Sequence, residues 1–219
     1  MVSTLSITTV IADYGRRLYE RGMLVGTEGN ISVRLDEHRI VVTPAGFPKG
    51  RLSAEDMVVV DRDGKPVEGT NQPSSELLMH LFVYECRPEI NACVHSHPPF
   101  ATAFAVAGIP LAVDVLPEVV LFVGRIPITQ YAQPGTAAVP KALEPYIVTC
   151  NAFVLRNHGL LTIGRDLEEA FHRHETVEHC ARIVFLARQL GNVQAIPSQD
   201  IERLKVIRGN AEKSRGSCF

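Results

Sequence analysis

Residues 90–100 read Ile-Asn-Ala-Cys-Val-His-Ser-His-Pro-Pro-Phe, an apolar run that ends in two histidines and two prolines. The run predicts a β-strand over residues 90–95, and Pro98-Pro99 predicts that a helix begins directly after it. Side chains two residues apart in a strand point to the same side, so His95 and His97 are expected to face one side together. Two imidazoles at the end of a strand are a plausible metal-binding pair.

Predicted helices and strands alternate along the rest of the chain. Helices are expected over residues 7–21 and 135–148, after Pro73 and Pro98, and from Asp166 to Gly191. Strands are expected over residues 31–34, 39–43, 57–60, 126–130 and 152–156. No repeat or linker interrupts this order, which predicts a single α/β domain over residues 1–219 with a central sheet covered by helices. The polar tail at about 198–219 is expected to be loosely held.

Composition excludes several classes of protein. The 219 residues are 46% apolar and 21% charged with a formal net charge of -2, and no run of Lys or Arg offers a nucleic-acid surface. The most apolar stretch, residues 100–124, contains two prolines and two acidic residues, which argues against a membrane span. The N-terminus lacks the pattern of a signal peptide. The five cysteines are an odd number without close pairs in the sequence, which is typical of reduced thiols. These features predict a cytoplasmic protein.

A third histidine has a similar position in the sequence. His158, in Arg156-Asn157-His158-Gly159, lies where another predicted strand meets a turn. Three histidine ligands, with the fourth coordination position open or occupied by a carboxylate, match a catalytic zinc site. Ordinary core or surface histidines would give the same sequence pattern. His172, His174 and His179 are expected on the solvated side of the last helix, His80 is expected to pack in the interior, and His38 is expected in a turn.

Three short segments could bind an anion. Pro73-Ser74-Ser75-Glu76 offers two hydroxyls at a helix start, where backbone N–H groups lack partners, although an ordinary helix cap reads the same way. Gly26-Thr27-Glu28-Gly29-Asn30 and Thr43-Pro44-Ala45-Gly46 contain glycines that would let backbone amides approach a phosphate. Two plain β-turns are the alternative for these segments. The sequence contains no nucleophile elbow, Rossmann fingerprint or Walker A loop.

Taken together, five motifs over roughly residues 8–190 resemble the class II aldolase/adducin family, most closely its fuculose-1-phosphate aldolase branch. The motifs are Gly29-Asn30-Ile31-Ser32, Thr43-Pro44-Ala45-Gly46, Pro73-Ser74-Ser75-Glu76, His95-Ser96-His97 and Asn157-His158-Gly159-Leu160. The resemblance implies a three-layer α/β/α sandwich around a largely antiparallel sheet. It also implies a C4 homotetramer whose active sites lie between subunits.

The resemblance further implies the site residues. Zinc, or manganese or cobalt in its place, would be bound by His95, His97 and His158, with Glu76 as a fourth ligand and as the acid/base residue. The residues implied to hold a substrate phosphate are Gly29, Asn30, Gly46, Ser74 and Ser75. The implied reaction cleaves a ketose 1-phosphate to dihydroxyacetone phosphate and a small aldehyde, with the metal acting as a Lewis acid.

Some positions depart from the family pattern. Ala45 stands where those aldolases have a hydroxyl residue that touches phosphate, and the tyrosines that protonate the aldehyde oxygen are missing. Glu118 or Tyr131 is the candidate replacement. The apolar residues Leu116, Val119 and Phe122 suggest an apolar aldehyde end, as in a deoxy- or methylthio-pentulose 1-phosphate.

Other members of the family offer alternative functions. A methylthioribulose-1-phosphate dehydratase, with a glutamate near Glu118, and a decarboxylase of a phosphorylated oxo-acid stay open. Epimerases of the family carry Asp at the position of Glu76, which favours the aldolase. An adducin-like scaffold is the alternative that is not an enzyme, and it would lack the three metal-binding histidines.

Overall fold

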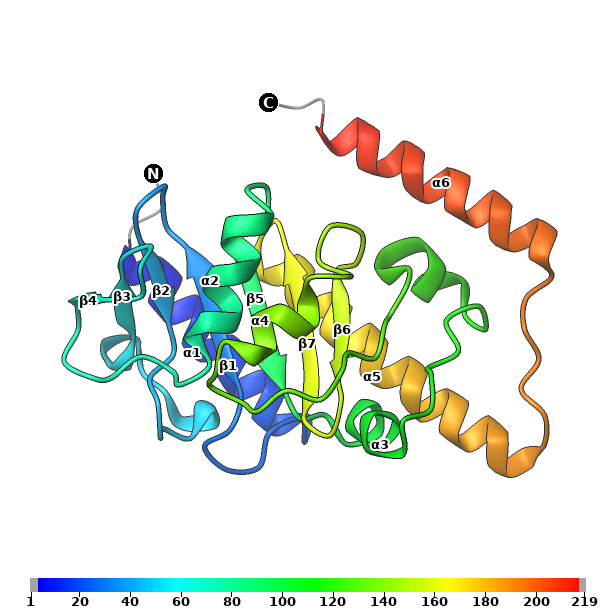
Figure 1. Ribbon diagram of the computed structural model, residues 1–219, viewed down its shortest axis with the longest axis horizontal. Coiled ribbons are helices and arrows are strands. Elements are labelled where there is room, and N and C mark those ends of the chain that lie inside the picture. Colours follow the sequence, from blue (N-terminus) through cyan, green and yellow to red (C-terminus); the bar gives the residue numbers. More distant parts are fainter. Residues whose placement is uncertain (1–3, 217–219) are drawn as a thin grey trace.

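A seven-stranded sheet forms the centre of the molecule, in the order β4-β3-β2-β1-β5-β7-β6 (Figure 1). The computed structural model describes residues 4–216, apart from a few side chains near the two ends. Every neighbouring pair of these strands is antiparallel. The strands are β1 (Asn30–Arg34), β2 (Ile40–Val42), β3 (Val58–Val60), β4 (Pro66–Glu68), β5 (Ala92–Ser96), β6 (Ala152–Leu155) and β7 (Gly159–Gly164).

Helices cover both faces of this sheet (Figure 1). The α-helices are α1 (Thr4–Glu20), α2 (Leu77–Cys86), α3 (Pro99–Ala107), α4 (Ala138–Leu143), α5 (Leu167–Leu190) and α6 (Ser198–Gly216). Shorter helical turns are η1 (Lys49–Arg51), η2 (Ala54–Asp56) and η3 (Val119–Val123). Helices α2 and α4 lie on one face, and α1, α3 and α5 lie on the other. The expected three-layer α/β/α sandwich with an antiparallel sheet is therefore confirmed.

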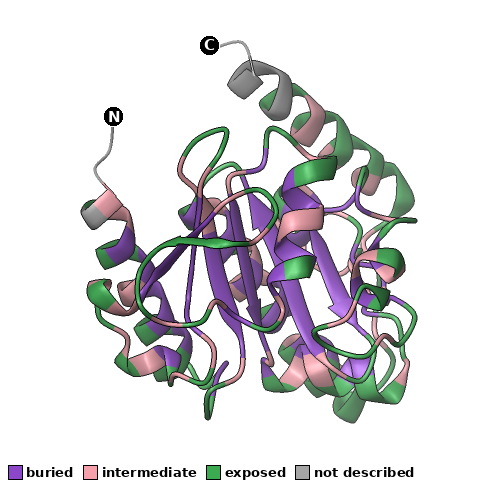
Figure 2. Ribbon diagram, turned by 60° about the vertical axis from the view of Figure 1, so that its left-hand side comes forward, coloured by how far each residue is buried: buried purple, intermediate pink, exposed green. Residues whose placement is uncertain are grey.

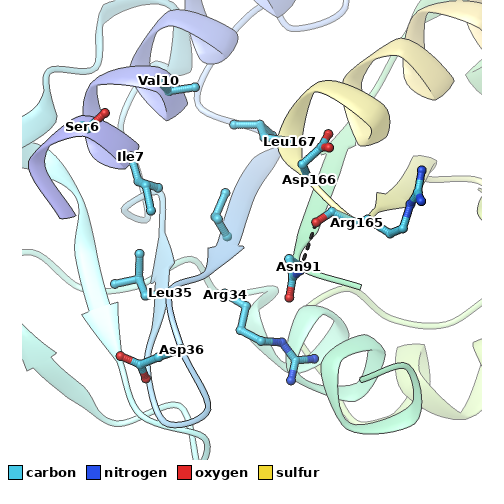
Figure 3. A pocket seen from close by; sticks show the side chains of 11 residues that line it. Ser6, Ile7, Val10, Arg34, Leu35, Asp36, Asn91, Arg165, Asp166 and Leu167 are labelled. Carbon is cyan, nitrogen blue, oxygen red and sulfur yellow. Dashed lines mark hydrogen bonds between the residues drawn. The ribbon is translucent and has the colours of Figure 1, made fainter. Parts of the chain in front are cut away.

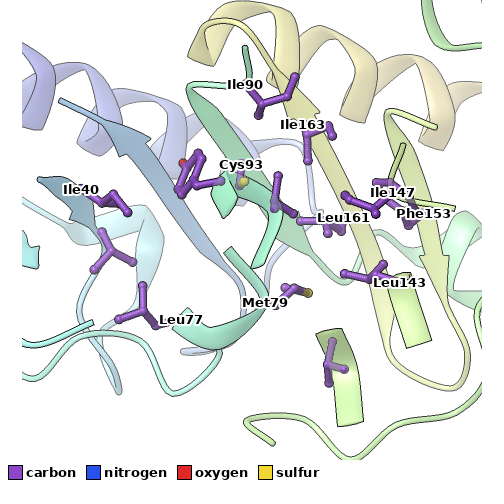
Figure 4. Close-up of a cluster of buried hydrophobic side chains, with 14 of the residues drawn as sticks. Ile40, Leu77, Met79, Ile90, Cys93, Leu143, Ile147, Phe153, Leu161 and Ile163 are labelled. Atoms are coloured by element: carbon purple, nitrogen blue, oxygen red, sulfur yellow. The ribbon is translucent and has the colours of Figure 1, made fainter. Parts of the chain in front are cut away.

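Separate apolar cores fill the two interfaces between sheet and helices. The strands between them are mostly buried (Figure 2), except for the exposed edge strand β4. On the α2 and α4 side, Leu77, Met79 and Leu143 contact the sheet residues Cys93 and Phe153 (Figure 4). On the other side, one cluster joins α1 to the start of α5, and another joins α3 and η3 to the rest of α5. Burial of these side chains on both faces is the main force that holds the layers together.

The alternation of side chains along β5 decides what each of its residues can contact. Cys93 belongs to the core under α2 and α4, whereas Ala92 and Val94 belong to the core under α1 and α5. His95 therefore faces the α2 layer and Ser96 faces the α5 layer. The strand thus separates the two polar residues onto opposite sides of the sheet.

Several elements differ from those predicted by the sequence. Strand β7 was not predicted, because the run Gly-Leu-Leu-Thr-Ile-Gly is too short to distinguish a strand from a turn. Residues 126–130 do not form a strand, and only Ile128 makes an isolated parallel bridge to Val154. Helix α4 is shorter than the predicted helix over residues 135–148.

The polar tail contains a helix that the sequence analysis did not predict. Helix α6 lies outside the three layers (Figure 1), close to η3, and the Arg208 guanidinium lies against Gly124 just after η3. Residues 217–219 of the predicted tail lie outside the described residues. Within residues 4–216, no helix combines the length and the hydrophobicity needed to cross a membrane.

Candidate metal centre and active site

The three predicted metal-binding histidines lie together at one end of the sheet. The ring centroids of His95 and His158 are 4.7 Å apart, those of His97 and His158 5.0 Å, and those of His95 and His97 5.2 Å. One nitrogen from each ring lies within 4.8 Å of the other two. His95 comes from β5, His97 follows that strand directly, and His158 lies in the turn between β6 and β7. The geometry is that of a three-histidine site for a metal ion.

The β6–β7 turn is shaped so that His158 reaches the strand beside it. Leu155 pairs with Gly159 across the turn, and the His158 N–H donates to the Leu155 carbonyl. Asn157 adopts a φ of 54°, a left-handed conformation that Asn tolerates better than most residues. Gly159 lacks a Cβ that would lie 2.5 Å from the Ser96 carbonyl oxygen. The short asparagine and glycine side chains therefore allow the turn to approach β5 closely.

The orientation and burial of the imidazole nitrogens suit them to bind a cation. Nδ1 of His95 donates to the Leu160 carbonyl at 2.9 Å, which directs Nε2 toward the other rings. Among the described residues, Nε2 of His97 has no hydrogen-bond partner although it is buried. Burial and the two neighbouring imidazoles lower the pKa of His97 to about 4, so this ring is neutral at pH 7. Neutral, unpartnered imidazole nitrogens are what a divalent metal requires.

Glu76 brings a carboxylate to the same three rings. It lies at the N-terminal cap of α2, with Oε2 3.2 Å from His95 Nε2 and Oε1 3.1 Å from His158 Nε2. The Asn30 amide donates to Oε2 at 3.0 Å. Burial opposes ionisation, but the imidazoles of His95 and His158 hold the pKa of the Glu76 carboxyl well below its usual range. Glu76 is therefore an ionised carboxylate at the position of a fourth ligand.

The predicted phosphate segments lie side by side next to this cluster. Asn30 is the β1 residue directly opposite His95, and a Cβ on Gly29 would lie 2.8 Å from the His95 carbonyl oxygen. Thr43, which follows β2, exchanges backbone hydrogen bonds with Ile31 and with Ser74. The structure thus brings together all three sequence segments, although they are far apart in the chain.

The individual residues of these segments differ in their exposure. Gly46 has a φ of 72° and open space around its α-carbon, as a backbone site for a ligand requires. Ser74 is buried, and its hydroxyl accepts from the Glu76 N–H at 3.3 Å. Ser75 is exposed, and Gly135 lies beside its carbonyl oxygen. Ala45 carries no hydroxyl, so the loop contributes backbone groups at that position.

Two of the predicted catalytic residues, Glu118 and Tyr131, make no contact among the described residues that places them at the histidine cluster. Tyr131 is 61% exposed in the connection that leads to Gly135. Glu118 is half-buried at the start of η3, and its charge adds to the burial that raises the pKa of the Cys180 thiol in α5. Of the apolar residues expected near the aldehyde, Val119 is part of the core under α5, while Phe122 is 56% exposed.

His174 corrects one expectation from the sequence. It was expected on a solvated helix face, but its side chain is fully buried, in contrast to the exposed His172 and His179. Its Nε2 lies 2.6 Å from Ser96 Oγ, and its Nδ1 lies 3.0 Å from Thr162 Oγ1. His80, which was expected to pack, is buried with Nδ1 2.6 Å from Ser32 Oγ.

Two further residues near the cluster were missed by the sequence analysis. The buried carboxylate of Glu178 accepts the N–H groups of Phe100 and Ala101, in the first turn of α3, and so fixes the segment that follows His97. Lys49 is buried, and its ammonium group donates to Thr27 and Phe47, which belong to the two glycine loops. Lysine and glutamate are normally exposed, so a single sequence gave no signal for either position.

A separate pocket of about 340 Å³ lies away from the histidines. Figure 3 shows its lining side chains, which come from the N-terminal part of α1, the end of β1 and the start of α5. Asn91, which immediately precedes β5, marks this end of the strand and donates to the Arg165 carbonyl. None of the metal or phosphate candidates lines this pocket, so size alone does not identify the active site.

Comparisons with known proteins agree with this geometry. The model of the "Class II Aldolase and Adducin N-terminal domain" family matches residues 9–185. A 3-oxo-tetronate 4-phosphate decarboxylase from Haemophilus influenzae is 36% identical over 84% of this chain and 89% of its own length. A 5-deoxy-D-ribulose 1-phosphate aldolase from Bacillus thuringiensis is 34% identical over 89% and 91%. The structure of an L-fuculose 1-phosphate aldolase superposes with a TM-score of 0.85 at 32% identity, covering 94% of this chain and 96% of that one.

Proposed function

Because the chain belongs to the class II aldolase and adducin family, we propose that it is a metal-dependent lyase for a small phosphorylated keto sugar. The family's enzymes are metal-dependent, and the matched relatives include lyases. The observation that carries the proposal is the contact of the Glu76 carboxylate with two of three clustered imidazoles, beside the glycine loops. A scaffold without chemistry would have no use for these clustered imidazole nitrogens.

His95, His97 and His158 would hold the metal, with Glu76 as the fourth ligand before substrate binds. Zinc suits this donor set, and manganese or cobalt would accept the same ligands. When bound, the ion supplies a Lewis acid that stabilises negative charge on the substrate oxygens. Burial is the largest influence on His95 and lowers its pKa, but the Glu76 carboxylate and the Leu160 carbonyl together raise the pKa by more, so a positive charge is favoured at this position.

The substrate phosphate would lie in the loops next to the cluster. Gly29, Gly46 and the N-terminal turn before α2 offer backbone N–H groups, and Asn30, Ser74 and Ser75 offer polar side chains. Because these loops directly adjoin His95 and Glu76, a phosphate held there places the adjacent carbonyl group of a keto sugar toward the histidines.

For a ketose 1-phosphate the reaction breaks the bond between C3 and C4. The electron pair passes to C3 and the C2 carbonyl oxygen, while the proton of the C4 hydroxyl leaves and C4 becomes an aldehyde. Glu76 then delivers a proton to C3, which completes dihydroxyacetone phosphate. Glu118 and Tyr131 stay the candidates for exchanging a proton with the aldehyde oxygen, and we propose that a neighbouring subunit brings one of them to the site.

Decarboxylation is a second candidate, favoured by the relative that is 36% identical. Loss of CO2 from a 3-oxo-tetronate 4-phosphate leaves an electron pair on the carbon next to the carbonyl. The resulting three-carbon enediolate is the same as in the aldol cleavage. Glu76 would protonate the same carbon in both reactions, so one site accounts for either chemistry, and only the aldol cleavage requires a base for a hydroxyl proton.

Release of dihydroxyacetone phosphate is the measurement that tests the proposal. Purified enzyme loaded with zinc would be given 5-deoxy- and 5-methylthio-pentulose 1-phosphates, fuculose 1-phosphate and 3-oxo-tetronate 4-phosphate. An aldehyde appearing together with dihydroxyacetone phosphate supports the aldolase, and CO2 appearing with it supports the decarboxylase. A dehydrated diketone, an epimer, or no product from any of these compounds would contradict both.

We also propose a cytoplasmic homotetramer with active sites between subunits. The aromatic residues Phe122 and Tyr131 are largely exposed in the single chain, which supports an interface. The thiols of Cys86, Cys93, Cys150 and Cys180 are free, as suits a reducing compartment. Light scattering of the purified protein tests the assembly, and a monomeric mass would contradict it.

A further inference from the structure

Lys49 is a fully buried lysine beside the candidate active site. Its residue exposure is 2%, which places it among the largest buried side chains of the described chain. Lysine is almost never buried to this extent unless its charge is paired. No carboxylate among the described residues lies within ion-pair distance of its ammonium group. A buried charge without a direct counter-ion calls for a functional explanation.

The ammonium group connects the two glycine loops. It donates to the Thr27 carbonyl and to the Phe47 carbonyl, both at 2.7 Å. Thr27 lies in the loop that ends at Gly29 and Asn30, and Phe47 follows Gly46 directly. One side chain therefore fixes the spacing of the two loops whose backbone amides are proposed to hold the phosphate.

The backbone of Lys49 is held in place from the other side by α1. A Cβ on Gly15 of α1 would lie 2.6 Å from the Lys49 carbonyl oxygen, and a Cβ on Gly50 would lie 2.5 Å from the Tyr19 ring. The absence of these atoms lets η1 lie directly against α1. Lys49 thus extends from a rigid base toward the loops rather than from a mobile connection.

The charges around the loops explain why a cation is useful there. The five residues proposed to bind phosphate carry no charge, whereas Glu28 and Glu76 are both close enough to Lys49 to raise its pKa. Burial is nevertheless the larger influence and lowers the pKa of Lys49 to about 8. A phosphate dianion next to two carboxylates would be repelled unless a positive charge lies nearby.

We propose that Lys49 is a positioning residue for the substrate phosphate, which holds the two glycine loops together and supplies positive charge beneath them. The inference rests on the proposed function in that it assumes a phosphate monoester as ligand. It does not depend on which bond is cleaved or on whether cleavage occurs. Glycerol phosphate, a phosphate monoester without a carbonyl group, therefore serves as the probe.

The experiment measures the affinity of the zinc-loaded full chain for glycerol phosphate by calorimetry. Lys49→Met, which keeps a similar length without the charge, is expected to weaken binding by about tenfold or more. Lys65→Met is the matched control, because the Lys65 side chain is 75% exposed between β3 and β4. The control is expected to bind like the wild type, and all proteins are expected to keep their zinc.

A second measurement separates charge from structure. A phosphate monoester is doubly charged above about pH 7, so a loss of affinity between pH 7.5 and 9.5 that Lys49→Met does not show must come from Lys49 and not from the probe. The wild type is expected to lose affinity as Lys49 loses its proton, while Lys49→Met is expected to be weak at both values. The carboxylates of Glu28 and Glu76 are the charged groups that raise the pKa of Lys49, and both stay ionised over this range; Tyr19 packs on the neighbouring Gly50.

If Lys49→Met does not fold, Lys49→Gln carries the same test, because its amide can still donate to a carbonyl. Undiminished affinity in a folded Lys49→Met or Lys49→Gln variant overturns the inference, as does a wild type that does not bind glycerol phosphate. A wild type that binds glycerol phosphate but cleaves no keto sugar overturns the proposed function and leaves the role of Lys49 supported. If the enzyme cleaves a keto sugar phosphate, Lys49→Met is expected to raise KM for that substrate, with a smaller change in kcat.

Discussion

Ser96 Oγ lies 2.6 Å from His174 Nε2, on the face of β5 opposite to the one that carries the metal-binding rings. The Thr162 hydroxyl donates to the Ala170 carbonyl at 2.8 Å, so its oxygen accepts from His174 Nδ1. His174 Nε2 must then accept the Ser96 hydroxyl proton. This buried network joins β5 and β7 to α5 behind the metal centre and fixes the strand that carries His95.

Replacing Ser96 by alanine is expected to lower the free energy of unfolding by about 1–3 kcal/mol, because it leaves His174 Nε2 buried without a donor. Urea unfolding measures the change, and metal analysis is expected to show zinc still bound. The double variant Ser96→Ala with His174→Leu should recover part of the loss, since both polar partners are then gone. Equal stability of Ser96→Ala and wild type would contradict the network.

The same buried histidine predicts a dependence of stability on pH. Burial lowers the pKa of His174 to about 3, whereas the unfolded side chain titrates near 6.5. Between these values the unfolded chain binds more protons than the folded one, so stability falls as the pH falls below about 6.5. The loss is up to about 1.4 kcal/mol per pH unit for this residue. Burial acts on His80 in the same direction, with a pKa of about 3.

Urea unfolding at pH 7, 6 and 5 checks this prediction. His174→Phe should show a shallower loss of stability toward acid than the wild type, whatever its stability at pH 7. His172→Phe is the matched control, since His172 lies on the same helix but is exposed. The prediction is wrong if both variants keep the slope of the wild type.

The metal centre could be predicted from the sequence because its signals are local. Strand periodicity placed His95 and His97 on one side, and the family resemblance added His158 as the third expected ligand. The expected alternation of side chains along β5 was confirmed. The three-layer sandwich was predicted from the order of helices and strands together with the family resemblance. The position of Glu76 at a helix start is a local pattern, but its expected role as a ligand and acid/base residue came from the family resemblance.

The residues that the sequence did not reveal depend on distant contacts. His174 lies among glutamates on α5 and looks solvated until Ser96, 78 residues away in sequence, is brought beside it. Lys49 looks like an exposed loop lysine until the fold buries it between two loops and α1. Glu118 and Tyr131 were inferred from what the family pattern lacks, and no contact within the described residues places either of them at the histidine cluster.

Replacing Glu76 by glutamine is expected to lower kcat by about 10²–10⁴-fold with a smaller effect on KM, because the amide cannot deliver a proton. Zinc should stay bound, since the three imidazole nitrogens form a cluster by themselves. Steady-state assays of dihydroxyacetone phosphate release and metal analysis test both parts. Glu85→Gln, an exposed change on the same helix, should behave as wild type. Full activity of Glu76→Gln would remove Glu76 from the proton transfer.

Replacing Gly15 by alanine tests the packing of α1 against the backbone of Lys49. The new methyl group would lie 2.6 Å from the Lys49 carbonyl oxygen, a backbone atom that must move to accommodate it. We expect a loss of about 1–3 kcal/mol in unfolding free energy. Since Lys49 moves with η1, affinity for glycerol phosphate should also fall. A destabilised variant that binds glycerol phosphate as tightly as wild type would contradict the link between α1 and the loops.

Replacing Gly159 by alanine should weaken metal binding without removing any ligand. The added Cβ would lie 2.5 Å from the Ser96 carbonyl oxygen and 2.6 Å from Cδ2 of the His97 ring, so the ring must be displaced. Metal sites depend on ligand positions that are held to a few tenths of an ångström, and loss of such support costs about 10–100-fold in affinity.

Competition with a chromophoric zinc chelator measures this change. Gly209→Ala in α6 is the matched control, because no atom lies within 4 Å of the position where its Cβ would be placed. That variant should keep the wild-type zinc affinity and gain up to about 1 kcal/mol of helix stability. If Gly159→Ala binds zinc as tightly as Gly209→Ala, the close approach of the β6–β7 turn to His97 does not set the geometry of the site. The three rings would then be positioned by β5 and by the hydrogen bond from His95 to Leu160 alone.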